Sequence, residues 1–129
     1  MSTTRIFKTQ WFSRFARRER IADARLVEAV RRAESGLVDA DLGGGVIKQR
    51  VARPGRGRSG GYRVLMAFRP SDRAVFMLGF AKSGRDNVTP DELESLKRAA
   101  VLWFASDTVR IETAIAEGVL AEVNYEDEK

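Results

Sequence analysis

The sequence predicts an α+β fold, and three observations support this. Amphipathic helical patterns lie towards both ends of the chain. Between them, three segments within 46–81 have the alternation or apolar composition of strands, with turn sequences between them. The 129 residues, 43% of them hydrophobic, suffice for one core. With no internal repeat or linker, we expect a single domain over 1–129 that contains an antiparallel meander.

The N-terminal third is predicted to hold one short strand and two helices. Residues 5–8 form the strand, Thr9 caps the first helix, and the second helix begins near Asp23 and ends near Gly36. Apolar residues recur at helical spacing on one face of each helix. They are Trp11, Phe12, Phe15 and Ala16 in the first helix, and Leu26, Val30, Ala33 and Leu37 in the second.

The middle of the chain reads as strands joined by turns. Residues 41–45 are expected to be a flexible turn, 54–61 a loop and 69–72 a turn, with strands at 62–68 and 74–81. Segment 46–52 alternates in the manner of a half-buried strand. Val46, Lys48, Arg50 and Ala52 would face one side, and Ile47, Gln49 and Val51 the other.

Two further helices are predicted near the C-terminus. Thr89, Pro90 and Glu92 have the spacing of a helix start with a reciprocal cap. The apolar face of that helix would consist of Leu93, Leu96, Ala100 and Trp103. A last helix is expected over 107–117, ended by Gly118, and the tail at 125–129 is expected to fray.

Composition excludes several kinds of site. The chain has no Cys and no His, which removes disulfides, thiolate nucleophiles, Ser-His pairs and histidine-ligated metals. No segment is apolar enough for a signal peptide or a membrane span. We therefore expect a soluble cytoplasmic protein without a metal, a cofactor or a membrane partner.

Two short motifs in the glycine-rich segment are accidental matches. Residues 55–60 match the dinucleotide-binding fingerprint, and 57–61 match the nucleophile elbow of hydrolases. Both motifs function only where a helix follows, whereas Tyr62 begins a strand sequence here. The elbow serine also needs a histidine base, which this chain lacks. Ser59 is therefore interpreted as a loop residue.

Positive charge is concentrated in the middle of the chain. Between Gly43 and Arg85 there are ten basic residues and one acid, Asp72, a net charge of +9. The other 86 residues hold 13 basic and 17 acidic side chains. Such a concentration indicates an anionic partner, with a solvated basic loop as the alternative. Charge position alone does not choose among RNA, DNA and an acidic protein.

The basic residues are predicted to converge on one face of the sheet. Lys48 and Arg50 are two residues apart on a strand, so their side chains project from one face about 7 Å apart. Arg63 lies on the neighbouring strand and is expected to face the charged surface rather than the core. Lys82 and Arg85 follow the next strand. This set suits charge stabilisation of a phosphodiester, and RNA could supply its own 2′-hydroxyl nucleophile if a lysine helps to remove the proton. A face that only binds phosphate is the alternative.

These residues carry a family resemblance. The order of elements resembles the RelE/ParE superfamily of bacterial toxins, and segments 39–63 and 76–87 resemble its HigB/RelE-like branch. The resemblance covers about residues 5–120. It implies a curved antiparallel sheet backed by helices. It also implies a metal-independent endoribonuclease that cleaves mRNA on the ribosome, and a cognate antitoxin that often has a helix-turn-helix DNA-binding domain.

The resemblance also implies roles for individual residues. Lys48 and Arg50 match the basic pair of such enzymes, and Arg63 matches the arginine that contacts the scissile phosphate. The positions of a further arginine and a base-stacking tyrosine hold Ser83 and Thr89, so that Lys82 or Arg85 would supply the charge and Phe80 a stacking ring. The implied catalytic residues are Lys48, Arg50, Arg63 and Lys82, and those implied to bind RNA or the ribosome are Arg53, Arg56, Arg58 and Arg85.

Two other functions are compatible with the sequence. A ParE-like toxin of the same fold would poison DNA gyrase without nuclease activity, and a nucleic-acid-binding module would have no catalysis. The convergence of basic strand residues favours RNA cleavage, because a protein that binds gyrase does not need a site for a scissile phosphate.

Overall fold

The structure, a computed structural model, describes residues 4–53, 57–85 and 87–124, with the side chains of 57–59 outside that description. Within these residues, six strands form one sheet in the order β2-β3-β4-β5-β1-β6. The elements along the chain are β1 (Arg5–Thr9), α1 (Gln10–Glu19), α2 (Asp23–Glu34), β2 (Ala40–Gly43), β3 (Val46–Arg53), β4 (Gly57–Arg69), β5 (Arg73–Ala81), α3 (Pro90–Ala105), α4 (Thr108–Ala116) and β6 (Leu120–Val123). The α+β fold is confirmed.

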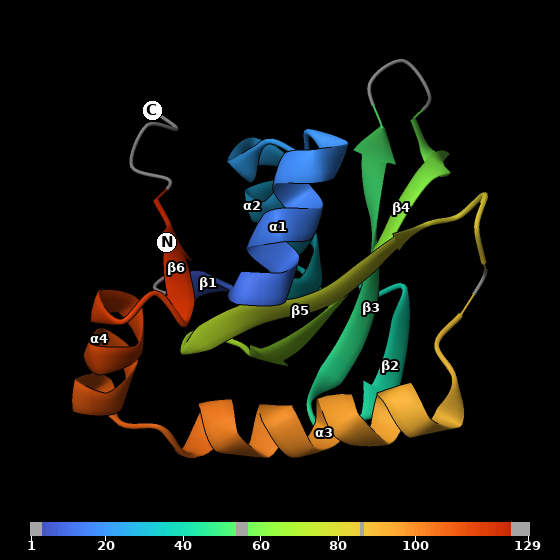
Figure 1. The fold of residues 1–129 in the computed structure, drawn as a ribbon. Coiled ribbons are helices and arrows are strands. Elements are labelled where there is room, and N and C mark those ends of the chain that lie inside the picture. Colours follow the sequence, from blue (N-terminus) through green and yellow to red (C-terminus); the bar gives the residue numbers. More distant parts are fainter. Residues whose placement is uncertain (1–3, 54–56, 86, 125–129) are drawn as a thin grey trace.

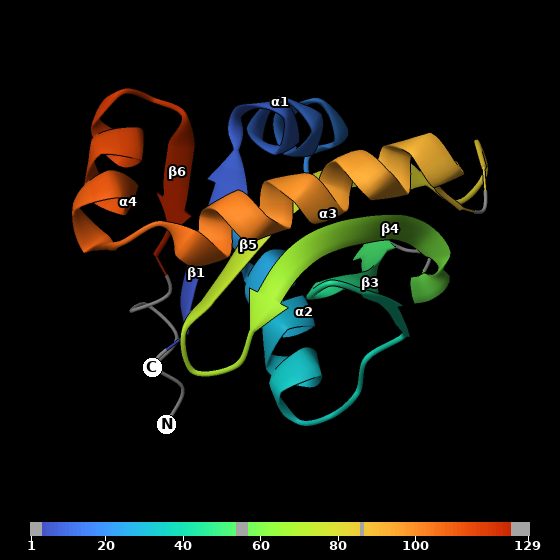
Figure 2. The same ribbon diagram turned by 90° about the horizontal axis from the view of Figure 1, so that it is seen from below.

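Helices cover the sheet from both sides. One core cluster joins α1 and α2 to the sheet through residues such as Phe12, Leu26 and Phe76. A second cluster joins α3 and α4 to the opposite face around Leu65 and Ala100. Figures 1 and 2 show α3 crossing the sheet on the side away from α1. The faces of the sheet are therefore buried by different helices.

The caps predicted at the start of α1 and at the start of α3 are both present. The Phe12 backbone N–H donates to Thr9 Oγ1 at 3.2 Å, which begins α1 directly after β1. At α3 the Glu92 N–H donates to Thr89 Oγ1 and the Thr89 N–H donates to Glu92 Oε1, a reciprocal capping box. These bonds satisfy backbone donors that have no partner within the helix.

Two of the expected irregular segments contain strand. Residues 41–43 of the predicted turn at 41–45 belong to the edge strand β2. The chain reverses at Gly44 and Gly45, whose φ angles are +64° and +82°. The predicted loop at 54–61 is also shorter than expected, because β4 already begins at Gly57. A bulge between Val51 and Arg53 lets the two strands pair close to the hairpin. Residues 54–56 lie outside the described part.

The second helix is shorter than its apolar pattern. It ends at Glu34, and Gly36 turns the chain with a φ of +89°. Leu37, predicted on the apolar face, lies beyond that turn and is 62% exposed. Placing Leu37 in the helical core was wrong, since the turn reverses the chain before the helical spacing reaches it.

The pairing around β1 was not predicted. β1 runs parallel to β5 and antiparallel to β6, so the sheet is antiparallel except at the β1–β5 pair. Strand β6 buries Leu120 and Val123 next to β1. The structured core therefore extends past residue 120, where it was expected to end, and β6 was not predicted. The tail at 125–129 lies outside the described residues.

The alternation predicted for β3 is confirmed. Ile47 and Val51 belong to the α1–α2 side, and Gln49 points the same way and is fully buried. Gln49 Nε2 donates to the carbonyls of Ala29 and Leu37, and its Oε1 accepts from the Asp39 N–H at 2.7 Å. This amide fixes β3 to the end of α2, and it leaves the intervening basic residues on the other face.

Candidate functional site

A basic face lies on the α3 side of the sheet, defined here by Lys48 and Arg50 on β3 and Arg63 on β4. Arg50 pairs directly with Arg63, and Arg63 pairs with Phe80 on β5. Directly paired residues project from the same face, and Lys48 is two residues from Arg50. The structure therefore brings together three of the four predicted catalytic residues.

Arg63 is the most enclosed member of the basic face. It lies on β4, between β3 and β5, and only 8% of the residue is exposed. The expectation that it faces the charged surface rather than the core was therefore only partly right, because Arg63 lies on that face of the sheet but is buried there. Among the described residues, its Nη1 atom is buried and has no hydrogen-bond partner. A buried guanidinium N–H without an acceptor is costly, and an anion would satisfy it.

The other two members of the basic face are more open. Lys48 is half-buried, and its Nζ donates to Asn87 Oδ1 at 3.4 Å. The side chain of Arg50 is exposed and has no partner in the described part of the chain. Its backbone is fixed, because the Arg50 N–H donates to Asp39 Oδ2 at 2.7 Å. Asn87 is a site residue that sequence reasoning missed, since no motif or spacing marks it.

Phe80 and Arg85 lie beside Arg63. The Arg85 guanidinium lies 4.6 Å from the centre of the Phe80 ring, and its Nη1 donates to Glu92 Oε1 at 2.7 Å. The hydrogen bond from Arg85, together with that from the Thr89 N–H, lowers the pKa of Glu92 below its ordinary value. Phe80 is buried beneath Arg85, so it does not present the open ring that base stacking needs. The expectation that Phe80 supplies stacking was wrong.

Lys82 marks the outer end of the same region. Its backbone N–H donates to the Gly61 carbonyl, which continues the pairing of β5 with β4 by one residue. Its side chain is exposed, with no partner in residues 4–53, 57–85 and 87–124. Lys82 therefore adds an unpaired charge near Arg63, although nothing fixes the position of its ammonium group.

The match to a protein-family model agrees with this arrangement. Residues 4–123 match the RelE toxin of the RelE/RelB toxin–antitoxin system. The chain belongs to the RelE toxin family. It is thus a toxin of a toxin–antitoxin system, and an antitoxin is its partner. A search of curated proteins found no match.

Not every predicted RNA-binding residue of this RelE-family toxin lies on the basic face. The Arg53 guanidinium lies 5.5 Å from the centre of the Tyr62 ring, and Tyr62 belongs to the α1 side of the sheet. Arg53 is two residues from Val51 on β3, so the alternation of the strand places it on the α1 side with Val51 and away from Arg50 and Arg63. Arg56 and the side chain of Arg58 lie outside the described residues.

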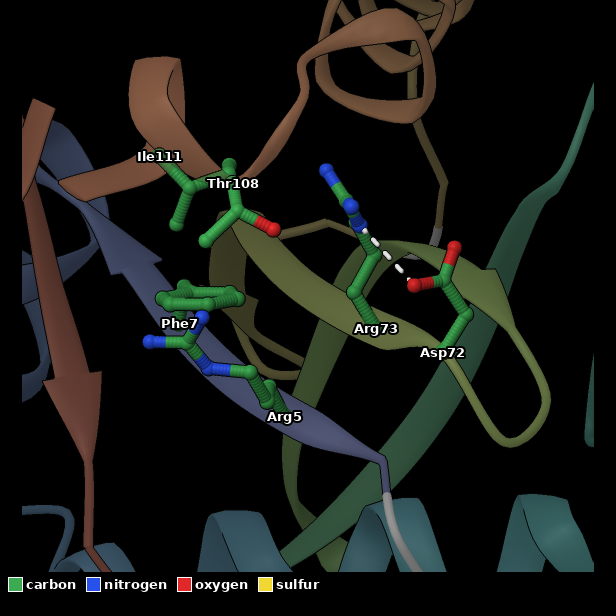
Figure 3. Close-up of a pocket in the computed structure, with 6 residues that line it drawn as sticks. All are labelled: Arg5, Phe7, Asp72, Arg73, Thr108 and Ile111. Carbon is green, nitrogen blue, oxygen red and sulfur yellow. Dashed lines mark hydrogen bonds and ion pairs between the residues drawn. The ribbon is translucent and has the colours of Figure 1, made fainter.

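A small pocket of about 110 Å³ lies at the other end of β5 from Phe80 (Figure 3). It is lined by Arg5, Phe7, Asp72, Arg73, Thr108 and Ile111. Its charges are already paired within the toxin, since Arg5 binds Glu112 and Glu122, and Arg73 contacts Asp72 at 3.3 Å. We assign these residues a structural role, holding α3 and α4 to the start of β5.

Two further features bear on the function of the toxin. The described residues contain no group of three or more Asp or Glu that could hold a metal ion. No helix in the described part of the toxin is long and apolar enough to cross a bilayer.

Proposed function

We propose that this toxin is an endoribonuclease that cleaves mRNA on the ribosome and so inhibits translation. Family membership supports the toxin role. The nuclease assignment rests on one observation, the environment of the Arg63 side chain. Its guanidinium is buried on a central strand, its Nη1 has no acceptor among the described residues, and Arg50 lies directly across from it. A phosphate group would supply the missing acceptor and neutralise the repulsion between the two arginines.

The proposed reaction uses the RNA itself as the nucleophile. The ribose 2′-oxygen attacks the adjacent phosphorus, the bond from phosphorus to the 5′-oxygen breaks, and a cyclic phosphate and a free 5′-hydroxyl result. Arg63 stabilises the charge that develops on the phosphate oxygens, because its planar fork holds two oxygens in fixed geometry. Lys48 lies on the same face, where its Nζ could move the proton that leaves the 2′-hydroxyl or the one that the 5′-oxygen gains.

The remaining basic residues have supporting roles in this proposal. Arg50 and Lys82 are exposed and unpaired in the described chain, so they bind neighbouring phosphates of the mRNA. Arg85 is held by Glu92 over Phe80 and sets the edge of the site. We propose that Arg56 and Arg58 extend the contact with RNA, and that no metal takes part, since lysine and arginine provide the proton transfer and charge stabilisation.

The partners follow from the same chemistry. We propose that the ribosome presents the mRNA, that the toxin acts in the cytoplasm, and that the antitoxin has a helix-turn-helix DNA-binding domain. We further propose that the toxin lies on the HigB-like branch, on the resemblance of segments 39–63 and 76–87.

Induced expression of the toxin without antitoxin, followed by mapping of transcript ends, tests the proposal. Growth arrest with cuts aligned to codons is expected, and Arg63→Ala should lower the cleavage rate by about 10² to 10³-fold, the usual effect of losing one electrophilic donor. Arg98→Ala removes an exposed arginine of α3 that is not part of the basic face and is the control.

Other outcomes would contradict the assignment. DNA damage without transcript cuts would indicate a gyrase poison, and growth without arrest would indicate a non-catalytic binding module. An Arg63→Ala toxin that cleaves at the normal rate but unfolds at a lower temperature would show that Arg63 only stabilises the fold.

A further inference from the structure

A second cationic surface lies on the outer side of α1, on the opposite side of the sheet from the basic face. We define this α1 surface by Trp11, Arg14, Arg17, Arg18 and Arg53. Trp11, Arg14 and Arg18 follow the spacing i, i+3, i+7, which aligns them along one exposed stripe of the helix. All three of these residues are exposed.

Aromatic rings hold several of these side chains in place. The indole of Trp11 stacks on Phe15 with centroids 5.5 Å apart and planes at 17°, and Phe15 meets the edge of Tyr62 at 5.8 Å. Because Phe15 covers one face of the indole and Trp11 is 41% exposed, the other indole face is open to solvent. The Arg18 guanidinium lies 5.7 Å from the Phe15 ring centre. With Arg53 over Tyr62, cations and an open aromatic face share one surface.

Within the described residues, the nearby acidic groups neutralise only part of this surface. Glu19 accepts hydrogen bonds from Arg18 at 3.5 Å and from the Tyr62 hydroxyl at 3.2 Å. Asp23, at the start of α2, pairs with Lys8 at 3.0 Å. Arg14 and Arg17 are exposed and have no partner within the described residues. Their charges are left for an external polyanion.

We propose that the α1 surface binds ribosomal RNA while the basic face on the other side of the sheet holds the mRNA that is cut. This inference rests on the proposed function, and it assigns a second, separate RNA contact. An open indole face stacks an unpaired base, and guanidinium groups bind the flanking phosphates. An acidic protein segment would use the arginines but would leave the indole without its natural partner, which favours RNA.

Sedimentation of the full-length toxin with intact ribosomes at several salt concentrations tests the inference. The variant R14Q/R17Q removes two charges from the α1 surface, and R98Q/R110Q removes two exposed charges from α3 and α4 as the matched control. Each lost phosphate contact lowers the slope of log affinity against log salt by about 0.7 to 0.9. R14Q/R17Q should therefore lower the slope by roughly 1.4 to 1.8, whereas the control should keep the wild-type slope.

A second variant separates stacking from charge. Trp11→Ala should weaken ribosome binding at every salt concentration without changing the slope, because base stacking releases no counterions. Leu102→Ala is its control, since Leu102 is also a large exposed apolar residue but lies on α3. Thermal melting of all variants establishes that each one is folded. None of the changed arginines is buried, so all should melt as the wild type does.

The outcomes distinguish this inference from the proposed function. If the wild type cleaves mRNA and R14Q/R17Q keeps the wild-type slope and affinity, the inference fails and the proposed function stands. If the slope falls as expected but no toxin variant cleaves mRNA, the proposed function fails and the RNA contact stands. If R14Q/R17Q loses antitoxin binding alone, the α1 surface is a protein interface. Absence of any wild-type binding to ribosomes overturns both.

Discussion

Arg50 and Arg63 lie directly opposite each other on the antiparallel strands β3 and β4. Like charges in this relationship destabilise a sheet, since their side chains project side by side from one face. Arg50 is exposed to solvent, whereas Arg63 is buried with only 8% of the residue exposed. The folded toxin thus maintains a repulsion that a bound anion would relieve, and this relationship yields the first prediction.

Replacing Arg50 with Glu should convert the repulsion into an attraction. We expect Arg50→Glu to raise the free energy of unfolding by about 0.2 to 1 kcal/mol, the range of cross-strand pairs, and to weaken RNA binding. Denaturant unfolding measures the first effect and anisotropy with a labelled RNA the second. Lys82→Glu is the control, because Lys82 lies past the end of β5 with no directly paired arginine. Lower stability in Arg50→Glu would mean that the two guanidinium groups do not interact.

Replacing Arg63 with Met should separate stability from activity. The Nη1 donor of Arg63 is buried without a partner in the described structure, and an apolar side chain of similar length removes that cost. We expect Arg63→Met to raise the free energy of unfolding by about 1 kcal/mol while abolishing cleavage. Denaturant unfolding beside a transcript-cleavage assay checks both. A marked loss of stability would show that Arg63 makes stabilising contacts in the free toxin.

Replacing Glu92 with Gln should remove a pH-dependent contribution to stability. The folded-state pKa of Glu92 is lowered, chiefly by the hydrogen bond from Arg85, so its contribution is fully present above the ordinary value of 4.5 and disappears as pH falls through the folded pKa. Gln keeps the capping-box acceptor for the Thr89 N–H but not the charge. Wild type should lose its advantage over Glu92→Gln as the pH falls below about 4.5. Melting curves from pH 3 to 7 measure this, and a constant difference would rule out the ion pair as the cause.

Replacing Gly61 with Ala should disrupt the bulged end of the hairpin. A Cβ at Gly61 would lie 2.2 Å from the Val51 carbonyl oxygen and 2.9 Å from the Arg53 nitrogen, which are backbone atoms and cannot rotate away. We expect a loss of about 1 to 3 kcal/mol, as for other overpacked sites, together with weaker cleavage because Arg63 is two residues away. Gly84→Ala is the control, since its nearest atom would be 3.6 Å away. Equal stability of the two variants would mean that the hairpin adjusts without strain.

Local patterns in the sequence were sufficient for most elements and for the composition of the basic face. Thr9, Thr89 and Glu92 marked two helix starts because capping depends on residues close in the chain. The alternation of β3 separated Lys48 and Arg50 from Gln49 because side chains on a strand alternate between faces. The resemblance to RelE toxins was confirmed by the family match over residues 4–123.

These local patterns did not predict contacts between residues that are distant in the chain. Strand β6 has too few residues to show a period, and its place is set by pairing with β1 at the far end of the chain. The contact of Arg53 with Tyr62 depends on the pairing of β3 with β4, and the burial of Phe80 depends on the packing of α3 on the sheet. Asn87 reaches Lys48 across 39 positions. The sequence by itself determined which residues are charged, apolar or able to cap, because these are local properties. Only the tertiary structure decided which charges are paired, buried or open, because that depends on which distant segments lie side by side.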